Sequence, residues 1–310
     1  WSIATASDFD PSEPQTVGPM PGVSLGPMTT APAPSPRRKE MLRSLGSTMS
    51  LSFSAPTTAT YVAAPERTRA SACATPYANP ALSFAASSED PASGGRHKVW
   101  GSKPLWVLPQ TSTIASHLPK ALGTAVAIEQ AKRIGHDSPI PDDSIAICSF
   151  GDASSNHATA QTAFNAAAWT SYQKLPAPVL FVCEDNGIGI SVKTPGGWIE
   201  RNFAKRDDLD YFYADGLDLA TGYGQVQAAV EHCRRTRRPT FLHLRTTRIM
   251  GHAGTDFEIE WRPIEELVAV EAGDPLLRSA AIALESGLYS KEQLLALYED
   301  IRRKCFAAAD

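Results

Sequence analysis

Residues 144–189 read SIAICSFGDASSNHATAQTAFNAAAWTSYQKLPAPVLFVCEDNGIG and contain two apolar runs separated by an alanine-rich stretch. The runs over 144–150 and 178–183 have the length of buried strands, and the stretch over 156–172 has a helical composition. A strand, a helix and a second strand in this order predict a parallel pair joined by a right-handed crossover. The carboxyl ends of both strands then lie on one edge of a sheet, where ligands bind in proteins of this class.

The sequence on either side extends the same alternation. Residues 118–134 carry apolar side chains at helical spacing opposite a charged face, which predicts a helix. Further along, residues 224–235 predict a helix and residues 240–244 a third strand. A final helix begins at Ser290, because Ser290 and Gln293 have capping-box spacing. We therefore expect an α/β fold with a mostly parallel sheet and helices on both faces.

The first 92 residues differ in composition from the rest of the chain. More than half of them are Ala, Ser, Thr or Pro, and the stretch over 50–64 has little persistent apolar period. Such a segment cannot bury enough apolar surface to offset the entropy of ordering it. We expect residues 1–92 to be disordered or poorly packed, with a marginal helix over 37–45 as the alternative. Residues 93–310 form the folded domain.

The composition excludes several classes of protein. The chain has 310 residues with 29 Lys and Arg against 33 Asp and Glu, so no positive excess attracts a nucleic acid. Its five cysteines form no C-x-x-C pair, which favours reduced thiols in the cytoplasm over disulfides or a zinc site. No apolar run approaches the roughly 20 residues that cross a bilayer, and no signal-peptide pattern is found. We expect a cytoplasmic protein without nucleic-acid or membrane partners.

Polar residues follow both strands of the central unit. Asp152 comes after the first strand, and Asn186 comes after the second. A carboxylate, an amide oxygen and a backbone carbonyl suit Mg²⁺, which keeps open positions for phosphate oxygens and water. The amides of Ala153 and Ser154, at the start of a helix, can donate to phosphate. Each motif alone is ordinary turn chemistry, but their pairing across one strand–helix–strand unit favours a metal and phosphate site.

Three stretches resemble those of a known family. Residues 151–191 resemble the thiamine diphosphate motif, in which Gly-Asp-Gly, a helix and a strand lead to an Asn-containing loop. TSTIASHLPKALGTA over 111–125 and LRTTRIMGHAGTD over 244–256 are similar to further stretches of the same family, in the same order. From residue 93 to 310 the chain is similar to the α subunit, or α half, of the E1 component of 2-oxo acid dehydrogenase complexes. The resemblance implies a thiamine-diphosphate-binding fold, with residues 1–92 foreign to the family.

The resemblance also implies a role for individual residues. Asp152 and Asn186 would hold Mg²⁺ by side-chain oxygens, and Ile188 by its carbonyl. Ala153, which stands where Gly is usual, and Ser154 would contact the diphosphate of the cofactor.

Further cofactor contacts are implied elsewhere in the chain. Ile114 would be the apolar wedge against the cofactor, with Ser112 nearby, and His117 would lie near a K⁺ ion. His252 would be catalytic, facing the thiazolium and the substrate. The residues themselves support this role, because His252 lies in a glycine-flanked loop after a strand and histidine titrates near neutrality. A surface-loop histidine is the alternative.

The family's activity is oxidative decarboxylation of a 2-oxo acid, followed by acyl transfer to a lipoyl group on a partner acyltransferase. The resemblance implies that this chain acts only with an E1 β subunit or β half, and its motifs favour branched-chain members. A non-catalytic or truncated remnant, which binds partners but not cofactor, is the rival. One feature supports this rival. The family has a Tyr-Arg pair upstream of residue 93 that contacts the diphosphate, and no such pair is found here, since Tyr61 is followed by Val62. A Rossmann domain is disfavoured by the lack of G-x-G-x-x-G after a strand.

Overall fold

The computed structural model describes part of the second of two compact units, residues 1–35 and 36–310. The described residues are 60–63, 82, 86–91, 93–96, 99–102, 106–110, 113–253 and 256–309. Ser112 and the alternative helix over 37–45 lie outside them.

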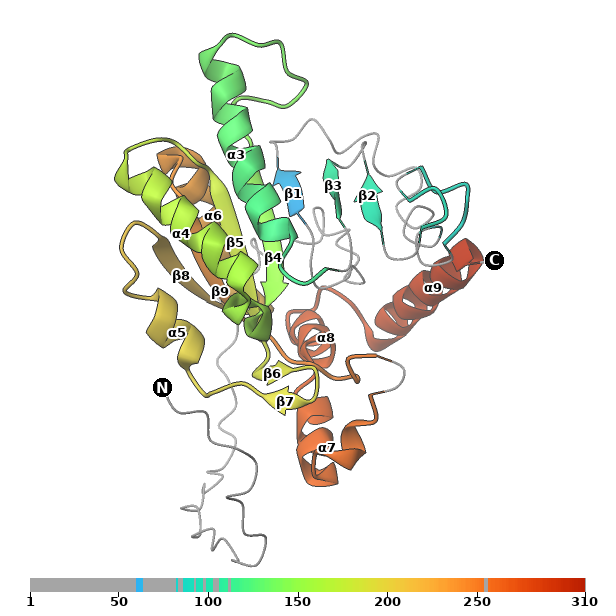
Figure 1. Ribbon diagram of the computed structural model, residues 1–310. Helices are drawn as coiled ribbons and strands as arrows, with labels where there is room; N and C mark the ends of the chain where they lie inside the picture. The colour runs from blue at the N-terminus through green and yellow to red at the C-terminus, as the bar shows by residue number, and fades with distance from the viewer. Residues whose placement is uncertain are drawn as a thin grey trace, which may run out of the picture. The chain divides into compact units, whose positions relative to one another are not determined.

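In the described part of the chain, seven strands form one sheet in the order β2-β3-β1-β4-β5-β9-β8 (Figure 1). Its parallel part consists of β4 (Ile145–Gly151), β5 (Val179–Asp185), β9 (Thr240–Arg245) and β8 (Asp210–Asp215). Three antiparallel strands extend it beyond β4, namely β1 (Thr60–Ala63), β3 (Val107–Gln110) and β2 (Trp100–Ser102). The expected α/β class and parallel strands are confirmed.

Helices cover both faces of the parallel strands (Figure 1). On one face α3 (His117–Arg133), α4 (Ala158–Tyr172) and α5 (Trp198–Phe203) pack against the sheet. Five phenylalanines fill this layer, and Phe164 lies at its centre with ring centroids 5.1–5.7 Å from four others: Phe150, Phe181, Phe203 and Phe241. On the other face α6 (Leu219–Thr236) packs against β5, β8 and β9. Burial on both faces explains why β4 and β5 read as continuous apolar runs.

The predicted helices are present, with two informative details at their starts. α6 begins five residues earlier than predicted, because the Asp218 carboxylate accepts hydrogen bonds from the amides of Ala220 at 3.1 Å and Thr221 at 3.4 Å. α9 (Lys291–Ala309) has the predicted capping box. The Ser290 amide donates to Gln293 Oε1 at 2.8 Å, and the Gln293 amide donates to Ser290 Oγ at 3.3 Å.

Strand β1 differs from the expectation for the N-terminal segment. Its four residues pair with β4 over Thr60–Ala63 and with β3 through Tyr61. These four residues are therefore part of the sheet. Thr, Tyr and Val fit a pleated sheet well, but four residues are too few to produce a recognisable apolar period. The character of the rest of residues 1–92 stays a prediction.

Several short elements were not predicted from the sequence. Two of them, β6 (Ile188–Gly189) and β7 (Val192–Lys193), form a small hairpin after β5. The strands β1, β2, β3 and β8, the helix α5 and the 3₁₀ turns η1 (Asp152–Asn156) and η2 (Glu258–Glu260) were not predicted either. The helices α7 (Ile264–Ala272) and α8 (Pro275–Glu285) lie before α9. Among the described residues, no helix is both long enough and apolar enough to cross a bilayer.

Candidate functional site

The candidate site lies where β4 and β5 end. The parallel register pairs Gly151 with Glu184, so the residues that follow, Asp152 and Asp185, leave the same edge of the sheet. Asp152 is only 1% exposed. The amides of Ala153 and Ser154 belong to the 3₁₀ turn η1, and α4 starts only at Ala158.

The hairpin β6–β7 folds back onto this turn. Thr194 Oγ1 donates a hydrogen bond to Asp152 Oδ2 at 2.6 Å, and the Thr194 amide donates to the carbonyl of Gly187 at 2.9 Å. A Cβ atom added to Gly189 would lie 3.1 Å from the Cβ of Ala153. The two sequence motifs therefore meet in space, as the strand–helix–strand topology predicts.

The oxygen donors at this place suit a hard cation. Asp152 contributes a carboxylate, and Asn186 Oδ1 accepts one hydrogen bond, from the Ile188 amide at 3.0 Å, which leaves a second lone pair. No group of three or more His, Cys, Asp or Glu side chains in the described residues is arranged to hold a metal. Amide and carbonyl oxygens beside a carboxylate are ligands that Mg²⁺ accepts.

The electrostatics of the site also favour a bound cation. Burial raises the pKa of Asp152, the Thr194 hydrogen bond lowers it, and the negative charge of Asp185 raises it again. The pKa of Asp185 is lowered, chiefly by its hydrogen bond from His243. Two carboxyl groups thus lie close together in a poorly solvated position, where a positive charge stabilises the ionised form of Asp152.

Ile114 precedes α3, and the start of α3 is tied to β4. His117, in the first turn of α3, donates from Nε2 to the carbonyl of Ser149 at 2.9 Å, which ties the start of α3 to the end of β4. Ala115 is buried and has a left-handed φ of 60°, an unusual backbone for a residue with a side chain. Ile114 directly precedes this residue, and its side chain is 55% exposed.

His252 lies in a loop that packs against the hairpin. Its amide donates to Asp256 Oδ2 at 2.8 Å, and a Cβ on Gly251 would lie 2.4 Å from the Asp256 carbonyl, so the tight turn requires glycine. Arg248 Nη1 donates to the carbonyl of Ile190 at 2.9 Å. His252 is an exposed residue. Hydrogen bonds from Arg248 to the Ile190 carbonyl and from the Ser191 hydroxyl to Asp256 hold its loop beside the hairpin.

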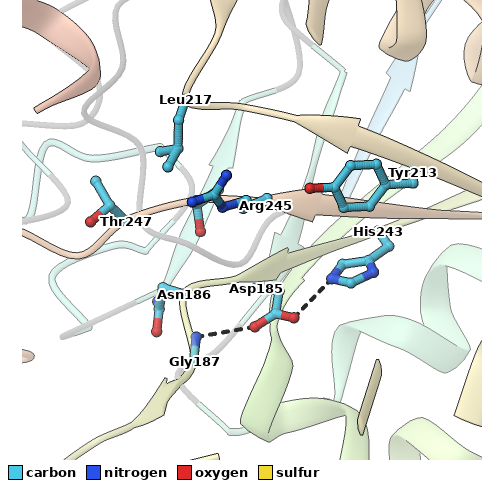
Figure 2. A pocket seen from close by; sticks show the side chains of 9 residues that line it. Asp185, Asn186, Gly187, Tyr213, Leu217, His243, Arg245 and Thr247 are labelled. Atoms are coloured by element: carbon cyan, nitrogen blue, oxygen red, sulfur yellow. Dashed lines mark hydrogen bonds and ion pairs between the residues drawn. The ribbon is translucent and has the colours of Figure 1, made fainter. Parts of the chain in front are cut away.

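A cavity of about 380 Å³ adjoins the loop that begins with Asp185, Asn186 and Gly187 (Figure 2). It opens between the ends of β5, β9 and β8 and is lined by Asp185, Asn186, Gly187, Tyr213, Leu217, His243, Arg245, Thr246 and Thr247. Sequence reasoning missed His243 as a member of the site. A histidine interrupting the apolar run TFLHL of β9 was the available signal.

A family model described as "Dehydrogenase E1 component" matches residues 75–310 of the chain. The chain belongs to this family. The match begins 18 residues before the domain boundary predicted at residue 93.

The E1 family chain is similar to curated proteins from bacteria and animals. It is 30% identical over 225 residues to "2-oxoisovalerate dehydrogenase subunit alpha" of Bacillus subtilis (strain 168), covering 71% of this chain and 64% of that protein. The mitochondrial protein of that name from Mus musculus is 26% identical over 224 residues, 71% of this chain and 48% of its own length. The somatic-form mitochondrial "Pyruvate dehydrogenase E1 component subunit alpha" of Homo sapiens is 28% identical over 176 residues, 54% of this chain and 44% of its own. The chain thus spans about half to two thirds of the relatives it matches.

Proposed function

We propose that this chain is the α-type subunit of a 2-oxo acid dehydrogenase E1 component that binds thiamine diphosphate and Mg²⁺. The reaction is oxidative decarboxylation of a 2-oxo acid, with acyl transfer to a lipoyl group on a partner acyltransferase. The observation that carries the proposal is the return of the hairpin β6–β7 onto Asp152, which brings the two motifs of the cofactor site together. The resemblance to 2-oxoisovalerate dehydrogenase α subunits supports a branched-chain substrate.

Each residue of the site has a defined task in this proposal. Asp152, Asn186 and the carbonyl of Ile188 would hold Mg²⁺, and the amides of Ala153 and Ser154 would face the diphosphate. When bound, thiamine diphosphate supplies the nucleophilic carbon and the electron sink for decarboxylation. The chain's own contribution is to neutralise and orient the diphosphate end.

Two further residues act nearer to the reacting centre. Ile114, which is exposed at the start of α3, offers an apolar surface for the cofactor to pack against. His252 would donate a proton or a hydrogen bond while the substrate reacts, and its loop position beside the hairpin supports this role. Replacing His252 by Ala should therefore reduce turnover more than it weakens cofactor binding.

The proposal includes a β partner. The apolar faces of α7, α8 and α9 are exposed, which supports assembly with another subunit. Since the β side of this family contributes the group that activates the cofactor, the chain alone should be inactive. We expect this assembly to be an α₂β₂ heterotetramer. A cytoplasmic location stays a prediction.

The test is decarboxylation of branched-chain 2-oxo acids and pyruvate with an artificial electron acceptor. The purified chain is assayed with and without a cognate β subunit, with thiamine diphosphate and Mg²⁺ present. Turnover only with β supports the proposal. Turnover by the chain alone contradicts the division of labour. Neither cofactor binding nor turnover in any combination favours the non-catalytic remnant.

A further inference from the structure

A buried carboxylate lies outside the residues assigned to Mg²⁺ and to the cofactor. Glu258, in the turn η2, is 8% exposed, and one of its oxygens, Oε1, accepts hydrogen bonds from two arginines. Arg248 Nη2 donates to it at 2.7 Å, and Arg262 Nη1 donates to it at 3.0 Å. The side chain of Arg248 is 14% exposed and that of Arg262 only 2%. Because charges at such positions are poorly solvated, the two guanidinium groups depend on the carboxylate that they share.

Trp261 and Asp256 complete the cluster. The guanidinium carbons of Arg248 and Arg262 lie 5.8 and 5.7 Å from the centre of the Trp261 ring, which is within the range of a cation–π contact. Trp261 Nε1 donates to Asp256 Oδ1 at 3.2 Å, and Arg248 Nη2 lies 3.7 Å from Asp256 Oδ2. That Oδ2 atom also accepts from the amide of His252. The cluster therefore reaches the backbone of the proposed catalytic histidine.

The same cluster contacts the hairpin β6–β7. Arg248 Nη1 donates to the carbonyl of Ile190 at 2.9 Å, and Ser191 Oγ donates to Asp256 Oδ1 at 3.0 Å. Both acceptor and donor lie in the turn between the two short strands of the hairpin. The hairpin in turn belongs to the loop that returns onto the first motif of the proposed cofactor site.

α7 reaches the hairpin by a second route, which is more exposed (Figure 1). Lys193 Nζ donates to Glu266 Oε2 at 2.7 Å, with side chains 62% and 31% exposed, and Arg262 Nε donates to Glu266 Oε1 at 3.1 Å. Exposed ion pairs contribute little to stability. The buried connection through Glu258 and Arg248 is therefore the stronger of the two.

We infer that Glu258 is a positioning residue, which holds Arg248 and Arg262 together and thereby fixes the loop of His252 on the hairpin β6–β7. Its effect on turnover rests on the proposed function. Without the charge of Glu258, the two guanidinium groups repel each other in a poorly solvated place, and Arg248 loses its shortest hydrogen bond. The loop of His252 should then leave the hairpin more often, while the residues assigned to Mg²⁺ keep their places.

The first measurement is hydrogen exchange of the His252 amide in the full chain, alone and with its β subunit, without cofactor. Glu258→Gln keeps the shape of the side chain and removes its charge. We expect exchange of this amide to become about tenfold faster, the size of effect that follows the loss of a hydrogen bond to a charged group, with β4 and β5 unchanged. Glu260→Gln is the matched control, because Glu260 lies in the same turn and is exposed. It should leave the exchange unchanged.

The second measurement separates turnover from cofactor binding, using the chain with its β subunit, Mg²⁺ and thiamine diphosphate. Glu258→Gln should lower kcat about tenfold, because a small displacement of a reacting group is costly, while the Kd of thiamine diphosphate changes less than about twofold. If Glu258→Gln does not fold, Arg248→Lys has the same expected outcome. Lysine keeps the charge of Arg248 but lacks the planar fork that donates to Glu258 and to the Ile190 carbonyl at once.

The outcomes separate the inference from the proposed function. Unchanged exchange of the His252 amide, or equal acceleration in β4 and β5, overturns the inference, and so does faster exchange with an unchanged kcat. A wild-type complex that does not bind thiamine diphosphate overturns the proposed function and the effect on turnover. The exchange measurement, made without cofactor, still decides in that case whether Glu258 holds the loop.

Discussion

The helices that cover the sheet, α3, α4 and α6, bury apolar side chains. The C-terminal helices α7, α8 and α9 leave theirs exposed or half-buried. α3, α4 and α6 bury apolar side chains against strands, among them Leu118, Phe164 and Ala229. α7 and α8 bury none, and every described side chain of α9 is exposed or half-buried. Yet α9 carries an apolar stripe at helical spacing: Leu294, Tyr298, Ile301 and Cys305.

The difference indicates that the helices on the sheet are stabilised by contacts within this chain. The C-terminal helices would gain comparable stability only from contacts with another subunit. Burying one large apolar side chain contributes about 1.5–3 kcal/mol, and helices of this length gain little stability from propensity alone. Extended exposed apolar surface on a protein is typical of an interaction site. The exposed large apolar side chains of α8 and α9 are Leu276, Leu277, Leu284, Leu295, Leu297, Tyr298, Ile301 and Phe306.

The largest contrast is expected from two phenylalanines. Phe164 is fully buried among four other rings, while Phe306 in α9 is 63% exposed. Phe164→Ala should lower the free energy of unfolding by about 3–5 kcal/mol, because it leaves a cavity in the core. Phe306→Ala should change it by about 0.5 kcal/mol or less. Denaturant unfolding measures both, and equal costs would contradict the contrast.

Hydrogen exchange should show the same contrast without mutation. Amides of α7, α8 and α9 in the isolated chain should exchange at least about tenfold faster than those of β4, β5 and α4, since few buried contacts oppose their opening. Addition of a β subunit should slow exchange in the three C-terminal helices. Uniform protection across both regions would show that the C-terminal helices are stabilised by this chain itself.

Protonation of His117 should make the stability of the sheet and its covering helices depend on pH. Burial lowers the pKa of His117, although its hydrogen bond to the Ser149 carbonyl opposes the shift. Because the unfolded chain then binds the proton more readily, stability is full above pH 6.5 and falls as the pH drops toward the lowered folded pKa. His117→Gln should remove part of this fall. Thermal unfolding between pH 5 and 8 measures it, and an identical pH slope in the variant would exclude His117 as a cause.

The smallest expected effects come from two N-terminal helix caps. In each of them a side-chain oxygen accepts a hydrogen bond from a backbone amide of the first turn. Asp218 caps α6 on the sheet, and Ser290 caps α9. Asp218→Ala should cost about 1 kcal/mol of global stability. Ser290→Ala should leave the global midpoint unchanged and increase exchange only in the first turn of α9. A global loss on Ser290→Ala would mean that α9 unfolds together with the sheet.

The sequence predicted best what depends on local pattern. Apolar runs gave β4, β5 and β9, and the crossover rule gave the meeting of Asp152 with the loop of Asn186. β8 was missed because its sequence DYFYAD places charges at both ends of an aromatic run. Asp185 and His243 are 58 positions apart in the sequence, and their hydrogen bond depends on the register of β5 against β9. No local pattern encodes this register. The exposed state of α9 could not be predicted either, since its apolar stripe is the same as that of a buried helix.

The central claim is that the edge formed by β4 and β5 binds thiamine diphosphate through a divalent cation held by Asp152. Isothermal titration of the chain with its β subunit, at fixed Mg²⁺, tests it with Asp152→Asn and with Asp142→Asn, an exposed carboxylate before the amino end of β4. The account predicts binding by wild type and Asp142→Asn, and a loss of about 100-fold or more in Asp152→Asn with an unchanged thermal midpoint. Equal affinity in all three proteins would contradict it.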